Sequence, residues 1–148
     1  MPSEISCGAV VFLRNPLKYL LLYRAPGEKF RESWDFPRGN VESTDKSEQE
    51  VARREIKEEA GITNLNFYDF RETIQFFFRF EGKTIKKQII YLLAETNQEQ
   101  IKISFEHNDY KWASYEEALQ ILKHKSSKEV LTKANNFLKI TLKQKTLF

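Results

Sequence analysis

Two long apolar stretches in the middle of the chain constrain its fold more than any other feature. They cover residues 65–80 and 84–95, and a short segment with the sequence Glu-Gly-Lys separates them. Runs rich in Phe, Ile and Tyr on either side of a short glycine-containing turn are typical of paired strands. We therefore expect a long antiparallel β-hairpin in this part of the chain.

Other apolar segments predict further strands. Residues 5–13 and 19–24 are rich in Val, Leu and aromatic residues, and a polar break that contains a proline separates them at 14–16. This pattern predicts a second pair of strands, which opens the domain. Shorter strands are expected at 34–36 and near 109–113.

A helix is predicted at residues 47–60. The segment, SEQEVARREIKEEA, consists mainly of good helix formers. Ser47 is a suitable N-cap with Glu50 three residues later, and Gly61 can end the helix in the left-handed conformation.

Two more helices are predicted in the C-terminal third. Ser114 and Glu117 form a capping-box pattern, and residues 126–145 place apolar side chains on one face at helical spacing. Strands and helices are thus mixed rather than strictly alternating, which predicts an α+β layered fold. The chain has 148 residues without a repeat or a long linker, so we expect a single domain over residues 1–148.

Charge and composition limit the ligand class and the compartment. The net charge is +3 and the pI is about 8.9, which suits a polyanionic ligand but is too mild to require a nucleic acid. The single cysteine, Cys7, cannot form an intrachain disulfide. No stretch reaches the ~18 apolar residues of a membrane span, and the N-terminus lacks a basic region followed by a long apolar run. We expect a cytoplasmic protein that contacts no membrane.

The predicted helix at 47–60 carries three carboxylates on one face. Glu55, Glu58 and Glu59 stand at positions i, i+3 and i+4, so their side chains are expected to lie close together. One interpretation is a solvated acidic face balanced by Lys57 and the neighbouring arginines. The other is a site for Mg²⁺ or Mn²⁺, since grouped carboxylate oxygens are the ligands that these cations prefer.

The surroundings of this helix favour the metal site and carry a family resemblance. The segment 39–62 resembles the Nudix box, which runs glycine, five residues, glutamate, seven residues, then Arg-Glu-aliphatic-x-Glu-Glu-x-Gly-aliphatic. Residues 54–62 match the second half completely. In the first half Asp45 stands where the glutamate is expected, one residue too far from Arg54. Glu48 is an alternative for that role.

The resemblance implies a fold and a chemistry. The fold would be an α/β/α sandwich around a mixed β-sheet with a C-terminal helix. Glu55, Glu58 and Glu59 would bind divalent cations, and the carbonyl of Gly39 would add a ligand. Arg54 would hold Glu55 in place, and Glu55 would take a proton from the attacking water. The reaction would be metal-assisted hydrolysis with Mg²⁺, or Mn²⁺ in its place.

Beyond the box, the chain is similar to the asymmetric diadenosine tetraphosphate hydrolases. The similarity is carried by residues 36–42, 87–95, 104–112 and 136–138. Four substrate-binding residues are implied: phosphate contacts by Arg38 and Lys87, and adenine contacts by Phe80 and Phe137. A further implied residue is Glu106, as a metal ligand or catalytic carboxylate.

These assignments have alternatives. Lys87 could serve only solubility at a hairpin edge. Phenylalanines crowd residues 76–80, so the aromatic contributed by this strand is loosely aligned. His107 is either a turn residue or an acid or base.

Three functions follow from these observations. The first is hydrolysis of diadenosine tetraphosphate to ATP and AMP. The second is removal of pyrophosphate from a 5′-triphosphorylated RNA end, or cleavage of another nucleoside polyphosphate. The third is a catalytically silent nucleotide-binding module, against which the intact Arg54, Glu55, Glu58 and Glu59 argue. No protein partner is implied.

Overall fold

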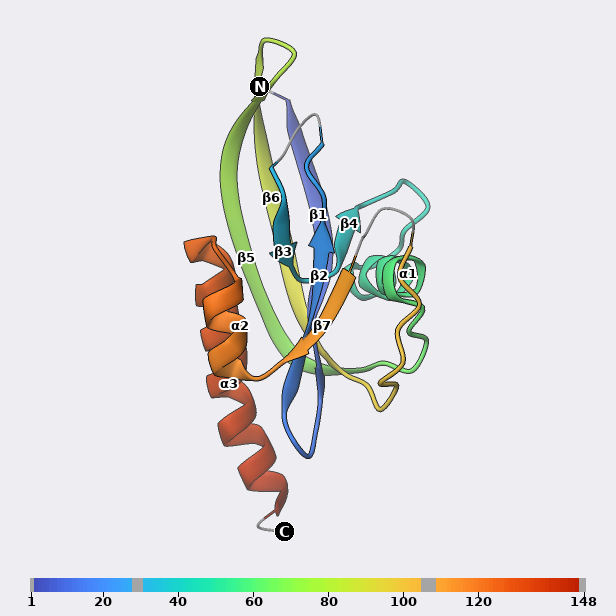
Figure 1. Cartoon of the computed structure of the whole chain (residues 1–148). Helices are drawn as coiled ribbons and strands as arrows, with labels where there is room; N and C mark the ends of the chain where they lie inside the picture. The colour runs from blue at the N-terminus through green and yellow to red at the C-terminus, as the bar shows by residue number, and fades with distance from the viewer. Residues whose placement is uncertain (1, 28–30, 105–108, 147–148) are drawn as a thin grey trace.

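The computed structural model describes residues 2–27, 31–104 and 109–146. It contains ten elements (Figure 1), which are β1 (Ser3–Leu13), β2 (Lys18–Arg24), β3 (Ser33–Asp35), β4 (Arg38–Asn40), α1 (Glu48–Ala60), β5 (Asn66–Phe80), β6 (Lys83–Glu95), β7 (Asp109–Ala113), α2 (Tyr115–Ile121) and α3 (Lys125–Thr146). Both predicted hairpins and all three predicted helices are confirmed. Strand β4 was not expected from the sequence.

All the strands belong to one mixed sheet. Its main path runs β3-β2-β1-β6-β5, with β4 paired to β1 and β7 paired to β2. Strands β1 and β6 are parallel, from Ser3 opposite Lys86 to Phe12 opposite Glu95, whereas the other pairs are antiparallel. The parallel pair at the centre joins the two hairpins into one sheet.

Strand β1 has different partners on its β2 side along its length. Near its C-terminal end Phe12 lies opposite Tyr19 of β2, and in its first half Gly8 lies opposite Arg38 of β4. A Cβ atom at Gly8 would lie 2.1 Å from the carbonyl oxygen of Pro37. The glycine therefore permits β4 to lie directly against β1.

Helices cover both faces of the sheet, with α1 on one side and α2 and α3 on the other (Figure 1). Alternate residues of β1 face the two layers, as the pleat of a strand requires. Val11 belongs to the buried cluster of Ile56 from α1, and Val10 to that of Leu131 and Leu138 from α3. The expected α+β architecture, with an α/β/α sandwich and a C-terminal helix, is confirmed.

Local capping fixes the position of α1. The Ser47 hydroxyl accepts a hydrogen bond from the Glu50 backbone N–H at 3.1 Å, and Gly61 ends the helix with a φ of 69°. A glycine adopts this left-handed conformation without the steric cost of a side chain. Because both ends are fixed, the buried Ile56 and the carboxylates of the same helix have defined directions.

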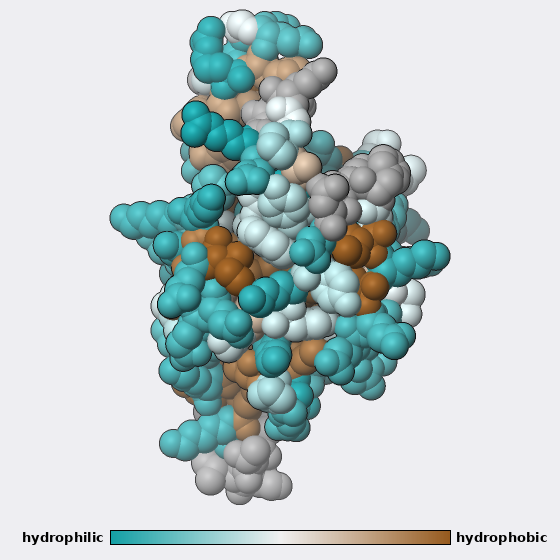
Figure 2. All heavy atoms as spheres, viewed as in Figure 1, coloured by the Kyte–Doolittle hydropathy of each residue, from teal (hydrophilic) through white to brown (hydrophobic). Residues whose placement is uncertain are grey.

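The surface in Figure 2 is mostly hydrophilic, with hydrophobic side chains in small separate patches. Among the helices of the described residues, none is long and apolar enough to cross a lipid bilayer.

Candidate active site

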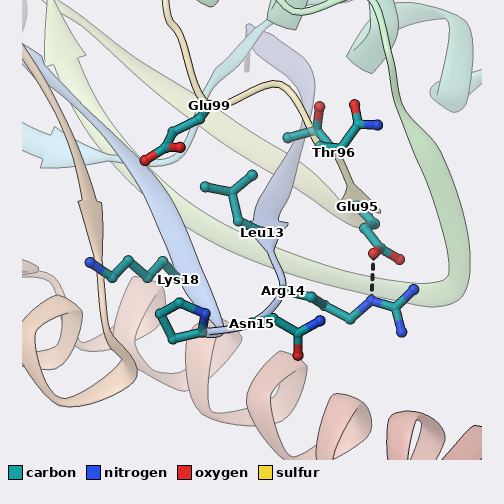
Figure 3. A pocket seen from close by; sticks show the side chains of 9 residues that line it. Leu13, Arg14, Asn15, Lys18, Glu95, Thr96 and Glu99 are labelled. Carbon is teal, nitrogen blue, oxygen red and sulfur yellow. Dashed lines mark hydrogen bonds and ion pairs between the residues drawn. The ribbon is translucent and has the colours of Figure 1, made fainter.

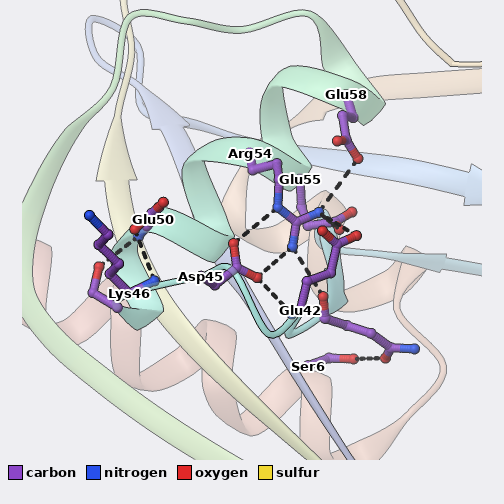
Figure 4. Close-up of polar contacts among 10 residues, drawn as sticks. Ser6, Glu42, Asp45, Lys46, Glu50, Arg54, Glu55 and Glu58 are labelled. Atoms are coloured by element: carbon purple, nitrogen blue, oxygen red, sulfur yellow. Dashed lines mark hydrogen bonds and ion pairs between the residues drawn. The ribbon is translucent and has the colours of Figure 1, made fainter.

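Arg54 is the centre of a network of acidic groups on α1 and the loop before it (Figure 4). Its Nε and Nη2 donate to the two carboxylate oxygens of Asp45 at 3.2 and 2.8 Å. Its Nη1 donates to Glu55 Oε1 at 2.6 Å, and Nη2 also donates to the carbonyl of Asn40 at 3.2 Å. A two-pronged contact between guanidinium and carboxylate is among the strongest hydrogen-bonded pairs in proteins.

Asp45 fills the position of the missing glutamate despite the extra residue. Its carboxylate accepts a hydrogen bond from the Glu42 N–H at 2.7 Å, and its own N–H donates to the Glu42 carbonyl at 3.0 Å. This tight turn takes up the additional residue. The hydrogen bonds from Arg54, and then from Glu42, hold the pKa of Asp45 below its usual value.

Glu48 does not take this role. Its carboxylate accepts two hydrogen bonds from Arg71 of β5, at 2.8 and 2.9 Å. It lies seven residues before Glu55, about 10 Å along the helix axis, where α1 meets β5. The prediction that Glu48 could replace Asp45 was therefore wrong. It considered which face of the helix Glu48 occupies but not its distance from Glu55 along the helix axis.

The carboxyl group of Glu55 lies directly against the backbone of Gly39. A Cβ atom at position 39 would be 1.9 Å from Glu55 Cδ and about 2 Å from both carboxylate oxygens. Burial raises the pKa of Glu55, and the hydrogen bond from Arg54 opposes this increase. A raised pKa makes a carboxylate a stronger proton acceptor.

The three glutamates do not converge on one point as expected. Glu59 is only 4% exposed and lies close enough to Glu55 to affect its pKa. The side chain of Glu58 is 59% exposed, and its carboxylate lies 3.8 Å from Arg54 Nη1. Among the described residues, no three His, Cys, Asp or Glu side chains are gathered as a metal ion would require. Arg54 draws Glu55 and Glu58 toward itself.

The groups at this site nevertheless fit a hard divalent cation. The side-chain donors at this site are carboxylate oxygens, which suit Mg²⁺ and Mn²⁺. The space that a Cβ at Gly39 would fill is occupied by the Glu55 carboxyl group. The backbone of Gly39 and the carboxylate of Glu55 are thereby kept close to each other.

Arg38 and Lys87 lie on the opposite face of the sheet from Glu55. Arg38 Nη1 is 3.0 Å from Asp35 Oδ2 and donates to the hydroxyl of Tyr91 at 3.3 Å. Lys87 Nζ donates to Asn40 Oδ1 at 2.8 Å and to Glu4 Oε1 at 3.2 Å. The sheet therefore brings the two predicted phosphate-binding cations to one face.

The charge of Arg38 is influenced by its acidic neighbours, among them Glu59 of α1. Burial lowers the pKa of Arg38, but the nearby Tyr91, Asp35 and Glu59 raise it above its ordinary value. The guanidinium thus stays charged although it is mostly covered. Glu59 of α1 therefore lies close enough to Arg38 for their charges to interact.

The structure does not bring Phe80 and Phe137 together. Phe137 is half-buried, with its ring 5.6 Å from that of Phe70 and 6.5 Å from that of Tyr68. Phe80 is the last residue of β5, ten residues beyond Phe70, or roughly 33 Å along an extended strand. The two rings therefore do not form opposite walls of one slot. Glu106 and His107 lie outside the described residues.

Three residues that hold these groups lie in the segments 36–42 and 87–95 that carry the resemblance but were not predicted as site residues, namely Asn40, Glu42 and Tyr91. Asp35, which pairs with Arg38, was not predicted either, because a spacing of three residues indicates an ion pair only on a helix.

A pocket of about 540 Å³ lies elsewhere, at the far end of β1 from Gly39 (Figure 3). It is lined by residues that include Arg14, Lys18, Glu95 and Glu99. None of the predicted site residues lines this pocket, so it is separate from the Arg54 network.

Comparison with known proteins identifies the class to which this fold and site belong. The NUDIX domain family matches residues 6–134, and the chain belongs to this family of hydrolases. The asymmetrical bis(5′-nucleosyl)-tetraphosphatase of Mus musculus is 32% identical over 146 residues, which cover 90% of this chain and 94% of that protein.

Two further similarities concern the fold and a second activity. A crystal structure of a C. elegans Ap4A hydrolase binary complex superposes with a TM-score of 0.78 at 30% identity, covering 91% of this chain and 97% of the other. An RNA pyrophosphohydrolase from a Nitratiruptor species is 28% identical over 120 residues, covering 74% of this chain and 77% of that protein.

The contrast between Asp45 and Glu48 can be tested by substitution. Asp45→Asn removes the charge that fixes Arg54, so we expect turnover of a nucleotide substrate to fall by at least about tenfold, the scale of one charge-assisted hydrogen bond. Glu48→Gln weakens only the contact with Arg71 and should leave turnover within about twofold, since surface ion pairs contribute little. Steady-state kinetics of both variants would make the comparison. A larger loss in Glu48→Gln would overturn the assignment.

The close approach at Gly39 gives a second prediction. In Gly39→Ala the new methyl group must displace the Glu55 carboxyl group, and a shift of about 1 Å at a catalytic group can cost roughly 100-fold in rate. Gly27→Ala is the matched control, because its Cβ would meet no atom within 4 Å. Kinetics and thermal unfolding should show a large loss of kcat/KM only for Gly39→Ala. Equal activity of the two variants would contradict the geometry.

Proposed function

We propose that this Nudix hydrolase cleaves a phosphoanhydride bond of diadenosine tetraphosphate, with water, to give ATP and AMP in a reaction that depends on a divalent cation. The observation that carries the proposal is the Glu55 carboxyl group, buried against Gly39 and held by Arg54. The choice of substrate is supported by the similarity over 90% of the chain to asymmetrical tetraphosphatases.

Mg²⁺ or Mn²⁺ would be held by Glu55, Glu58, Glu59 and the carbonyl of Gly39, where it would lower the pKa of water and neutralise charge on the phosphates. Side chains of the protein position the proton acceptor and accept the proton. Arg54 fixes the orientation of Glu55, and burial raises the pKa of Glu55 so that it can take a proton from the attacking water. The water oxygen forms a bond to phosphorus, and the P–O bond to the leaving phosphate breaks. The products are AMP and ATP, and the proton passes from Glu55 to solvent.

The substrate-binding residues are part of this proposal. Arg38 and Lys87 would contact phosphate oxygens, because both cations lie on the sheet face beside β4 and Glu59 lies close enough to Arg38 to raise its pKa. Phe137 would contact one adenine ring from α3, together with Phe70 rather than Phe80, because these two rings already pack edge to face. Stacking of a base on an aromatic ring contributes about 1 to 3 kcal/mol.

Removal of pyrophosphate from a 5′-triphosphorylated RNA is the second candidate function. It is favoured by the 28% identity to an RNA pyrophosphohydrolase. The carboxylate network would serve both reactions, since each breaks a phosphoanhydride bond. The two substrates differ in the group attached to the phosphates, which is a second adenosine in the dinucleotide and an RNA chain in the other case.

A product-resolved assay separates the two functions. The purified protein is incubated with Mg²⁺ and, separately, with diadenosine tetraphosphate, ATP or 5′-triphosphorylated RNA. We expect ATP and AMP in equal amounts from the dinucleotide. Activity on RNA alone would establish the second candidate, and inactivity on every substrate with either Mg²⁺ or Mn²⁺ would refute hydrolysis.

The carboxylate assignment is tested by Glu59→Gln. The substitution keeps the size of this 4% exposed side chain but removes its charge, so we expect turnover to fall by roughly 100-fold or more. The thermal unfolding midpoint should change little. Glu50→Gln, on the exposed side of the same helix, is the control and should keep normal turnover. An unaltered rate in Glu59→Gln would exclude a role for this carboxylate in the reaction.

A further inference from the structure

A series of buried polar contacts connects α3 to Arg38. Ser127 lies in the first turn of α3 and is only 1% exposed. Its hydroxyl donates to the carboxylate of Asp35, with distances of 3.2 and 3.3 Å to the two oxygens. Asp35 is the last residue of β3 and is 9% exposed. A side chain from the C-terminal helix thus touches the carboxylate that pairs with Arg38.

The carboxylate of Asp35 is held from three directions. Besides Ser127, the backbone N–H of Phe36 donates to Oδ1 at 2.9 Å, and Arg38 Nη1 lies 3.0 Å from Oδ2. The same Nη1 donates to the hydroxyl of Tyr91, whose ring is fully buried and packs edge-on against Phe36 at 5.4 Å. Arg38 is therefore anchored to partners that are themselves fixed.

The anchoring uses only one nitrogen of the guanidinium. Within the part of the chain that the structure describes, Nη1 makes both contacts of Arg38, and Nη2 and Nε make none. A guanidinium carries five N–H donors in a rigid plane. Fixing one nitrogen therefore sets the direction of the edge that remains for a phosphate.

We propose that Asp35 and Ser127 are positioning residues that hold Arg38 with its Nη2 and Nε edge directed toward the polyphosphate. This inference rests on the proposed function, in which Arg38 contacts phosphate. Through Ser127, the first turn of α3 becomes part of substrate recognition. A lysine at position 38 has one ammonium group and could not be anchored and bidentate at the same time.

The chain offers a matched control for the contact made by Ser127. Tyr19 of β2 donates to Asn135 of α3 at 2.6 Å, and both residues are buried. This is a second polar link between α3 and the sheet, eight residues further along the helix, and neither residue contacts Arg38. Tyr19→Phe and Ser127→Ala each remove one such link, but only Ser127→Ala acts on Asp35.

The experiment measures KM and kcat for diadenosine tetraphosphate. We expect Asp35→Asn to raise KM about tenfold, the scale of one weakened charge-assisted hydrogen bond, with kcat within about twofold, since phosphate binding is lost equally before and in the transition state. Ser127→Ala should raise KM by a smaller factor. Tyr19→Phe should leave KM unchanged. Equal effects of Ser127→Ala and Tyr19→Phe would overturn the role of Ser127.

A double-variant comparison tests whether Asp35 acts through Arg38. In an Arg38→Ala background, Asp35→Asn should have no further effect on KM, because the side chain that it positions is gone. The same increase in both backgrounds would refute positioning and leave Asp35 as a residue of the scaffold.

Binding of inorganic tripolyphosphate, measured by titration calorimetry on the same variants, separates this inference from the proposed function. A wild-type protein that hydrolyses none of the substrates would refute the proposed function. The inference would still hold if Asp35→Asn weakened tripolyphosphate binding in the wild-type background but not in Arg38→Ala. Unchanged affinity in Asp35→Asn would overturn it.

Discussion

The backbone of Gly39 lies so close to the carboxyl group of Glu55 that no side chain fits between them. This contact requires β4 to lie on β1 and α1 to lie over β4. The first condition depends on Gly8, which accommodates Pro37 and Arg38, and the second on the burial of Ile56 and its neighbours beneath the helix. Two glycines far apart in sequence therefore determine where α1 meets the sheet.

The three residues of β4 divide the chemistry of the site between two faces. Successive residues of a strand point to opposite sides, so Gly39 meets Glu55 on the side of α1 whereas Arg38 and Asn40 face the layer of α3. A short strand is sufficient to place carboxylates on one side and cations on the other. Glu59 of α1 nevertheless lies close enough to Arg38 to raise the pKa of its guanidinium.

Patterns within about ten residues were enough to predict most of the helices and strands, whereas the layered arrangement was implied by the family resemblance. The strands, the capped helix α1 and the capping box at Ser114 all depend on local spacing. Strand β4 could not be predicted, because three residues with a glycine have no periodicity of their own. The contact between Ser127 and Asp35 joins residues 92 positions apart, which no local pattern encodes.

The aromatic assignment on β5 shows a different limit. Phe76, Phe78 and Phe80 share one face of the strand by alternation, so periodicity predicts their side but not which of them lies near α3. That depends on where the helix crosses the strand, and the structure places Phe137 near Phe70 instead. The hairpin was predictable, whereas the crossing point was not.

The carboxylates of α1 show how like charges can be held together on one helix. Like charges at this spacing repel by about 0.2 to 0.5 kcal/mol per pair, and Arg54 offsets this by contacting Asp45, Glu55 and Glu58. Glu55 and Glu59 are constrained by burial, whereas Glu58 is exposed and, within the described part of the chain, has a single 3.8 Å contact with Arg54. A cation that bound beside Glu55 would compete with Arg54 for Glu58, and this side chain can turn at little cost because solvent surrounds it. In the proposed metal site, Glu58 is therefore the ligand that rotation of an exposed side chain would supply.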